Sequence, residues 1–253
     1  MKIISDINYS VYHECTLDIY LPDSNDFCVF IYFHGGGLEA GDKSEGRIMA
    51  EYLAERNIAV VSANYRMYPS AKYPDFITDA AECVSWVCSN IKKYGECKKI
   101  YIGGSSAGGY ISQMLCFDGK YLGRHNLKPM DFCGFIHDAG QPTVHFNVLR
   151  ERGLDTRRIV VDESSMLYHI GTDPEYPPML FIVSDSDMEN RYEQTILVIS
   201  TMKHFKYKEP DLEVVHGNHC EYITKVDEKG DSILGRIVLR YIEKNTMACE
   251  KEK

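Results

Sequence analysis

Ser106 stands at the centre of the pentapeptide 104–108, which reads Gly-Ser-Ser-Ala-Gly. A short apolar run precedes it at residues 99–102, and residues 110–117 have the composition of a helix. A serine at a sharp strand-to-helix turn is exposed at the end of a buried sheet, and glycine on both sides leaves room for that turn. The pattern therefore predicts a nucleophilic serine for acyl transfer, although the pentapeptide alone also fits a plain strand-to-helix connection.

A serine hydroxyl is a weak nucleophile at neutral pH, so acyl transfer needs a base and a carboxylate that orients the base. In enzymes with this turn, the acid and then the histidine follow the serine along the chain. We favour Asp187 as the acid, because it lies further into the loop after a predicted strand than Asp185 does. Asp185 is the alternative acid, and if it is not the acid we expect it to brace the turn. Glu189 is a third candidate for the acid.

His219 is the favoured base, because it lies in a tight loop, Gly-Asn-His-Cys, directly after a predicted strand. His216 is still at the end of that strand, where a histidine is more often structural, and it remains the alternative. The histidines at positions 125, 137, 145, 169 and 204 belong to no paired motif and are interpreted as surface or core residues.

A run of three glycines, residues 35–37, follows His34 and a predicted buried strand. The attacked carbonyl becomes an oxyanion, which needs preorganised N–H donors, and glycines let the bare backbone approach the substrate. We expect the amides of Gly36, Gly37 and Ala107 to form this oxyanion hole. The run also fits a flexible turn, whereas a phosphate loop is disfavoured because no Gly-Lys-Ser/Thr ending follows.

Strands alternating with helices must position these residues. We expect strands at residues 27–33, 58–63, 100–104, 132–137, 178–184 and 212–216, preceded by two edge strands within 3–21. We expect helices at residues 51–56, capped by Asp42 or Ser44, and at 74–94, 110–117, 193–205 and 232–244, with a frayed tail from Asn245. This order indicates an α/β fold with a doubly wound, mostly parallel sheet, in which ligands bind at the carboxyl ends of the strands.

The irregular stretch 141–176 contains no obvious strand and is interpreted as a small cap-like excursion over the site. The aromatic residues Tyr168, Tyr176 and Phe146, together with His145, belong to it and either stack on a substrate or simply pack. We expect residues 1–253 to form one domain, because the length suits a single α/β unit.

The composition favours a globular protein with a small-molecule substrate. The net charge of −9 argues against nucleic acids and anionic membranes as partners, and no apolar stretch is long enough for a signal peptide or a membrane span, which favours a cytoplasmic protein. Nine cysteines without a C-x-x-C pair fit reduced thiols rather than disulfides or a zinc site, so we expect no metal or cofactor.

Taken together, these motifs resemble the α/β-hydrolases of the esterase/lipase group related to hormone-sensitive lipase, and within it the small bacterial acetyl and feruloyl (carbohydrate-type) esterases. The residues that carry the resemblance lie between about 30 and 220: His34-Gly35-Gly36-Gly37, Ala40-Gly41-Asp42-Lys43, Asn64-Tyr65-Arg66, Pro69, Pro74, Asp79, Gly104-Ser105-Ser106-Ala107-Gly108-Gly109, Pro177-Pro178, Asp187 and Gly217-Asn218-His219. Leu38 departs from the pattern, because relatives often carry an aromatic residue there.

The resemblance implies a serine carboxylesterase with a Ser106-His219-Asp187 triad, acting on short-chain, aryl or carbohydrate esters such as acylated sugars or phenolic esters. It also implies that Tyr65, Arg66 and Asp79 brace the oxyanion loop. Hydrolases of this kind often pair through exposed edges, so a homodimer is among the partners considered. An arylformamidase or amidase on the same fold is the first alternative. A non-catalytic binding protein is the second, and it is disfavoured because every triad position has a candidate.

Overall fold

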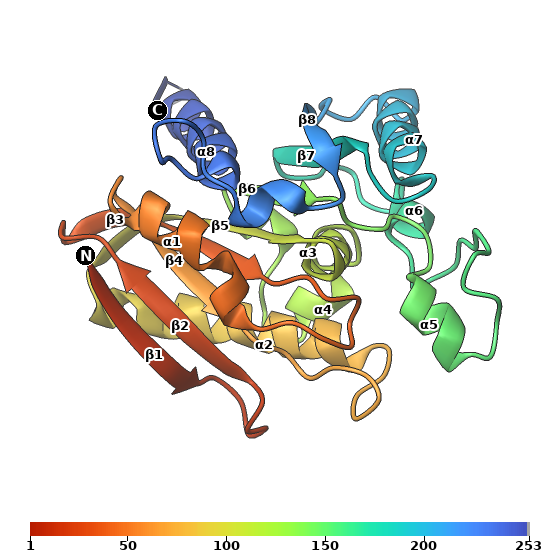
Figure 1. Ribbon diagram of the computed structural model, residues 1–253, viewed down its shortest axis with the longest axis horizontal. Coiled ribbons are helices and arrows are strands. Elements are labelled where there is room, and N and C mark those ends of the chain that lie inside the picture. The colour runs from red at the N-terminus through yellow and green to blue at the C-terminus, as the bar shows by residue number, and fades with distance from the viewer. Residues whose placement is uncertain (252–253) are drawn as a thin grey trace.

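A sheet of eight strands runs through the centre of the molecule in the order β1-β2-β4-β3-β5-β6-β7-β8 (Figure 1). This computed structural model describes residues 1–251. The strands are β1 (Lys2–Asn8), β2 (Thr16–Leu21), β3 (Asp26–Phe33), β4 (Ile58–Ala63), β5 (Glu96–Ser105), β6 (Gly134–Asp138), β7 (Met179–Ser186) and β8 (Asp211–Asn218).

The sheet is parallel from β4 to β8, while β1 and β2 pair antiparallel at one edge. The predicted doubly wound, mostly parallel sheet is therefore confirmed. The central strands β3 and β4 are apolar runs because helices cover both faces of the sheet, which leaves few of their side chains in contact with water.

Two layers of helices enclose the sheet (Figure 1). The helices α1 (Arg47–Ala54) and α8 (Ile233–Lys251) pack on one face, and α2 (Asp75–Asn90), α3 (Ala107–Phe117) and α7 (Arg191–His204) pack on the other. The shorter helices are α4 (Lys120–Gly123), α5 (Phe146–Glu151) and α6 (Met166–His169), with 3-10 turns η1 (Lys43–Gly46), η2 (Ile91–Lys93), η3 (Pro129–Asp131) and η4 (Glu221–Thr224).

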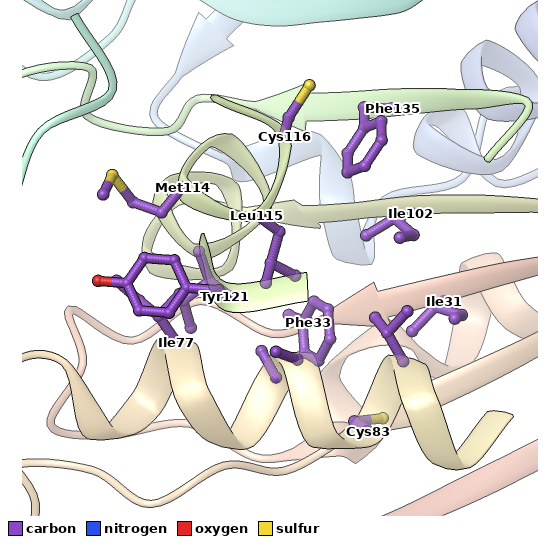
Figure 2. Packing of buried hydrophobic residues seen from close by; sticks show 14 of the residues in the cluster. Ile31, Phe33, Ile77, Cys83, Ile102, Met114, Leu115, Cys116, Tyr121 and Phe135 are labelled. Carbon is purple, nitrogen blue, oxygen red and sulfur yellow. The ribbon is translucent and has the colours of Figure 1, made fainter. Parts of the chain in front are cut away.

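Figure 2 shows the core that supports α3. Ile31 and Phe33 of β3 and Ile102 of β5 lie in one cluster with Leu115 of α3 and Cys83 of α2, and all five are buried. Burying each large aliphatic or aromatic side chain contributes about 1.5–3 kcal/mol. The core therefore fixes α3, and the turn at its first residue, against the carboxyl ends of β3 and β5.

The first helix begins earlier than its apolar pattern predicts. Asp42 caps η1 through a hydrogen bond from the amide of Ser44, at 2.9 Å, and η1 leads directly into α1 at Arg47. Asp42, one of the two expected alternatives, thus caps the turn that leads into the helix, whereas α1 itself follows Gly46 and has no side-chain cap. Between β6 and β7, residues 141–176 form α5, α6 and loops without a strand, and the structure describes all of them.

The prediction of a frayed tail from Asn245 is wrong, because α8 continues to Lys251. Side chains of the sheet hold this extension. The Lys99 ammonium donates to the carbonyl of Thr246 at 2.9 Å, and the Tyr101 hydroxyl lies 3.2 Å from the Thr246 hydroxyl. The last two tail positions, 252–253, lie outside the described residues. No helix within residues 1–251 is long and apolar enough to span a bilayer.

Candidate active site

Ser106 lies at the turn between β5 and α3, in a backbone conformation that is unusual for any residue except glycine. Its φ is 54° and its ψ is −111°, and its amide donates to the carbonyl of Asp138 at 2.8 Å. A Cβ at Gly108 would lie 1.9 Å from the carbonyl oxygen of Phe33, and one at Gly104 would lie 2.5 Å from the Gly108 backbone. The two glycines are therefore required for the turn that presents Ser106.

His219 follows β8 and reaches across to this turn. Its Nε2 lies 2.8 Å from Ser106 Oγ, and its Nδ1 lies 2.5 Å from Asp187 Oδ1. The Asp187 side chain is 1% exposed, whereas the His219 side chain is 21% exposed. The three residues favoured from the sequence thus form one hydrogen-bonded row, with its carboxylate end buried and its middle open to a substrate.

The Asp187 carboxylate is held by more than the histidine. It accepts hydrogen bonds from the amides of Ser184, at 3.1 Å, and Met188, at 2.7 Å. Burial alone would raise the pKa of Asp187, but the hydrogen bond and charge of His219 and these two amides outweigh it and lower that pKa below its usual value. Asp187 is therefore ionised at neutral pH, as a group that orients an imidazole must be.

The alternative acid and base pair with each other. Asp185 Oδ2 lies 2.7 Å from His216 Nδ1, and Asp185 Oδ1 accepts from the amide of Gly217 at 3.0 Å. The His216 side chain is 95% exposed, and its hydrogen bond with Asp185 and that residue's charge raise the pKa of His216. Asp185 therefore ties the end of β7 to β8, and Glu189 is an exposed surface residue.

The glycine loop follows β3 and runs past the serine. A Cβ at Gly35 would lie 3.3 Å from the Cβ of Ser106. Gly36 and Gly37 have φ values of 96° and 66°, which favour glycine, and a Cβ at Gly36 would lie 2.0 Å from the Ala40 carbonyl oxygen. Ala107 is the first residue of α3, so its amide has no acceptor within the helix.

Contacts from outside the loop fix the glycine backbone. Asn147 of α5 donates from Nδ2 to the carbonyl of Gly37 at 2.9 Å, which ties the excursion between β6 and β7 to the glycine loop. The Tyr65 hydroxyl donates to the carbonyl of His34 at 2.9 Å, and the two rings stack with centroids 4.5 Å apart. These contacts hold the segment in which the Gly36 and Gly37 amides lie.

Arg66 and Asp79, which the resemblance implies are structural, form a two-pronged ion pair. Arg66 Nη2 donates to Asp79 Oδ1 at 2.6 Å and Arg66 Nε donates to Asp79 Oδ2 at 2.9 Å. The Asp79 side chain is 1% exposed. The pair connects the segment after β4 to α2, beside the tyrosine that contacts the glycine loop.

One group that the sequence reasoning missed is the buried carboxylate of Asp138, at the end of β6. It accepts a hydrogen bond from Ser105 Oγ at 2.5 Å and another from the Tyr222 hydroxyl of η4, while the Tyr32 hydroxyl donates to Ser105 Oγ at 3.0 Å. Burial raises the pKa of Asp138 to about 6. The signal available in the sequence was an acidic residue directly after the predicted strand at 132–137.

The aromatic residues of the excursion divide between core and site. Tyr176 packs on Phe117, with centroids 4.7 Å apart, and His145 is buried and accepts from the amide of Asn147 at 3.2 Å. Tyr168 is 54% exposed. Phe146 meets the glycine loop, where its ring would lie 3.0 Å from a Cβ at Gly37.

Comparisons with known proteins agree with this fold. The family model BD-FAE matches residues 17–223. The probable isoprenylcysteine alpha-carbonyl methylesterase ICMEL2 of Arabidopsis thaliana is 36% identical over 120 residues, which are 46% of this chain and 28% of that protein. The chain thus spans little more than a quarter of the length of this curated relative.

Solved structures share the whole architecture. Esterase B of Lactobacillus rhamnosis superposes with a TM-score of 0.81 at 16% identity, covering 99% of this chain and 88% of that chain. A truncated carbohydrate esterase from gut microbiota superposes with a TM-score of 0.75 at 19% identity, covering 98% and 97% of the two chains. The shared architecture is the α/β-hydrolase fold.

Proposed function

The chain belongs to the BD-FAE family, and from this premise we propose that it is a serine carboxylesterase that hydrolyses small esters through an acyl-enzyme. One observation carries the proposal: Ser106 Oγ, the His219 ring and the Asp187 carboxylate form a row with contacts of 2.8 and 2.5 Å. The curated relative and the solved neighbours named above are esterases by name, which supports the same class of reaction.

In the first half of the proposed reaction, Ser106 Oγ attacks the ester carbonyl carbon while His219 Nε2 takes the hydroxyl proton. The carbonyl oxygen becomes an oxyanion, which accepts hydrogen bonds from the amides of Gly36, Gly37 and Ala107. The imidazolium then gives its proton to the departing alcohol as the carbon–oxygen bond breaks. Asp187 stays ionised throughout and keeps His219 Nδ1 protonated.

In the second half, water attacks the acyl-enzyme while His219 Nε2 takes one of its protons. The second tetrahedral species collapses, Ser106 regains its proton from His219, and the carboxylic acid leaves. The steep turn at Ser106 supports this cycle, because it holds the hydroxyl beside both the histidine and the first amides of α3.

The finer substrate class is an ester of a sugar or of a phenol. Its support is the carbohydrate esterase among the solved neighbours, together with the Phe146 ring beside the glycine loop, which offers an apolar surface to a flat or cyclic group. A panel of acetylated sugars and aryl acetates, compared by kcat/KM, tests this part of the proposal.

A homodimer through β8 is also part of the proposal. β8 pairs with β7 on one side, and its side chains Leu212 and Val214 are 37% and 44% exposed. An unprotected edge strand is a template for pairing with a second copy. Light scattering after gel filtration should give twice the monomer mass, and Val214→Lys should halve it; a monomer in the wild type contradicts the pairing.

Turnover of 4-nitrophenyl acetate tests the reaction class. Ser106→Ala should abolish it while the circular dichroism spectrum is unchanged, and Ser200→Ala, a substitution on the exposed face of α7, should retain it. Turnover of Ser106→Ala at the wild-type rate would exclude the proposed nucleophile. A parallel assay with 4-nitroacetanilide and N-formylkynurenine compares amide and formamide cleavage, and faster rates there would replace the esterase by an amidase.

A further inference from the structure

A cavity of about 310 Å³ lies between the start of α7, the loop at residues 156–159 and α5. The residues that matter for its chemistry are Gln141, Phe146, Arg157, Arg158, Arg191 and Gln194. None of these side chains belongs to the proposed triad or to the oxyanion amides. The cavity is therefore a feature of the molecule that the proposed reaction does not yet use.

The cavity adjoins the proposed catalytic row on two sides. Phe146 lines it and also lies against Gly37 of the glycine loop. Met188 lines it as well, and the amide of Met188 is hydrogen-bonded to the Asp187 carboxylate. These two residues place the cavity next to the glycine loop and the proposed triad acid.

Arg191 places a buried cation in the wall of the cavity. The residue is 5% exposed, and among the side chains that the structure describes, residues 1–246, no carboxylate lies at ion-pair distance from its guanidinium. Its polar contacts are neutral acceptors: Nη1 donates to the carbonyl of Ala139, and Nη2 lies 3.5 Å from Gln141 Oε1. Buried arginines are normally paired with an acid, because an unpaired charge loses its hydration without compensation.

The titration of Arg191 agrees with this geometry. Burial lowers the pKa of Arg191 to about 10, although the negative charge of Asp187 works in the opposite direction. A bound anion would compensate the cost of burying this charge. The guanidinium is thus preorganised for a carboxylate that a ligand supplies.

The surroundings of Arg191 strengthen its preference for an anion. Arg158 is exposed on the wall and forms no ion pair with the side chains described for residues 1–246, whereas Arg157 is paired with Asp155 at 2.6 Å. Arg191 opens α7, whose amino-terminal end adds a partial positive charge. Among the lining residues that the structure describes, Glu189 is the only acid.

We propose that this cavity binds a carboxylate carried by the ester substrate, paired with Arg191 and Arg158, and that the enzyme prefers acidic esters over neutral esters of the same size. This inference rests on the proposed esterase function and names its substrate class. Either the acyl part or the alcohol part of the ester can bear the carboxylate, and the two are separate arms of the test.

Two pairs of matched esters provide the test. On the alcohol side, 4-acetoxybenzoate is compared with its neutral analogue 4-acetoxybenzamide. On the acyl side, 4-nitrophenyl hydrogen adipate is compared with 4-nitrophenyl adipamate. We expect kcat/KM for the acidic ester to exceed that for the amide by at least about tenfold in one pair, mainly through KM, because charge-assisted bidentate hydrogen bonds are among the strongest.

Variants of the two arginines test whether the preference for acidic esters arises in the cavity. Arg191→Gln and Arg158→Gln should each reduce the acidic-to-neutral ratio toward one while leaving kcat/KM for the neutral ester within about threefold of the wild type. Arg124→Gln, on the exposed surface after α4, should keep the wild-type ratio. If Arg191→Gln fails to fold because Ala139 loses its partner, the acidic-to-neutral ratios of Arg191→Lys and Arg158→Gln replace it in the test, and both should fall toward one.

Two outcomes overturn the inference alone: neutral esters hydrolysed as well as the acidic ones in both pairs, or an acidic preference that persists unchanged in the folded variants. In both cases the proposed esterase function stands, because the neutral esters are still turned over. If none of the four esters is hydrolysed, the proposed function is overturned, and this inference with it.

Discussion

The Ser105 hydroxyl donates a hydrogen bond of 2.5 Å to the carboxylate of Asp138, one residue before the turn that carries Ser106. The same carboxylate accepts from the hydroxyl of Tyr222, which lies three residues after His219. One buried acid thus joins the segment of the proposed nucleophile to the segment of the proposed base. The effect of this buried acid on the free energy of unfolding can be measured.

Asp138→Asn should change how stability depends on pH. Burial raises the pKa of Asp138 from 3.8 to about 6, so the folded protein binds this proton more tightly than the unfolded chain does. The contribution of Asp138 to stability therefore falls as pH rises through the interval from 3.8 to about 6, by about 3 kcal/mol. Asparagine does not titrate, so the wild type should lose stability relative to the variant over that interval.

Urea unfolding of both proteins at pH 4, 5, 6 and 7 measures this difference. The other carboxylates titrate in both proteins and largely cancel in the comparison. A difference in the free energy of unfolding that stays constant from pH 4 to pH 7 would show that Asp138 does not titrate there.

The two aspartates after β7 should behave differently when substituted. Asp187→Asn should lower kcat for 4-nitrophenyl acetate by about 10⁴-fold, because an amide no longer holds the imidazole in the required tautomer. Asp185→Asn should keep kcat within a few-fold of the wild type, because Asp185 contacts the exposed His216. Comparable kcat values for the two variants would remove the distinction between them.

His219→Gln and His216→Gln form the matching pair for the base. His219→Gln should lose turnover as Ser106→Ala does, and the double variant should be no worse than either single one, because members of a triad act as a unit. His216→Gln should be nearly silent. If His216→Gln loses activity and His219→Gln keeps it, His216 is the base.

Much of this arrangement was predictable from the sequence. The central strands are continuous apolar runs, and Gly36, Gly104 and Gly108 mark positions where a Cβ would clash with backbone atoms. Chain order then limited the acid to three candidates and the base to two. Short-range patterns of this kind are sufficient to predict a site residue wherever its position depends on the local backbone.

Gly108→Ala should prevent the close approach of α3 to β3. The added Cβ would lie 1.9 Å from the Phe33 carbonyl oxygen, and the two backbones cannot separate without disturbing the core between them. We expect a loss of several kcal/mol or insoluble protein. Gly123→Ala, in α4, adds a Cβ with nothing within 4 Å and should leave the melting temperature unchanged or slightly raised. Equal melting temperatures for the two variants would contradict this explanation.

Asn147→Ala should slow the reaction while leaving the fold intact. It removes the hydrogen bond from Nδ2 to the Gly37 carbonyl, so the proposed oxyanion amide is less well fixed in the transition state. We expect kcat to fall about tenfold with little change in KM. Asn90→Ala removes a similar bond to the Trp86 carbonyl in α2 and serves as the control. A change confined to KM would indicate a role in binding instead.

The features that the sequence did not predict depend on contacts between distant residues. Asn147 and Gly37 are 110 residues apart, and Lys99 and Thr246, whose bond extends α8, are 147 apart. Arg191 reads as an ordinary polar residue at the start of a helix, and only the tertiary structure shows it buried without an acid. No periodicity or local motif records such pairs, so they appear only once the chain is folded.

Labelling with paraoxon, followed by mass spectrometry of tryptic peptides, tests the central claim that Ser106 is the nucleophile. We predict one diethylphosphoryl group per chain, on the peptide that contains Ser106, formed in step with the loss of esterase activity and absent from Ser106→Ala and His219→Gln. A phosphoryl group on a different residue, or equal labelling of Ser106→Ala, would contradict the account.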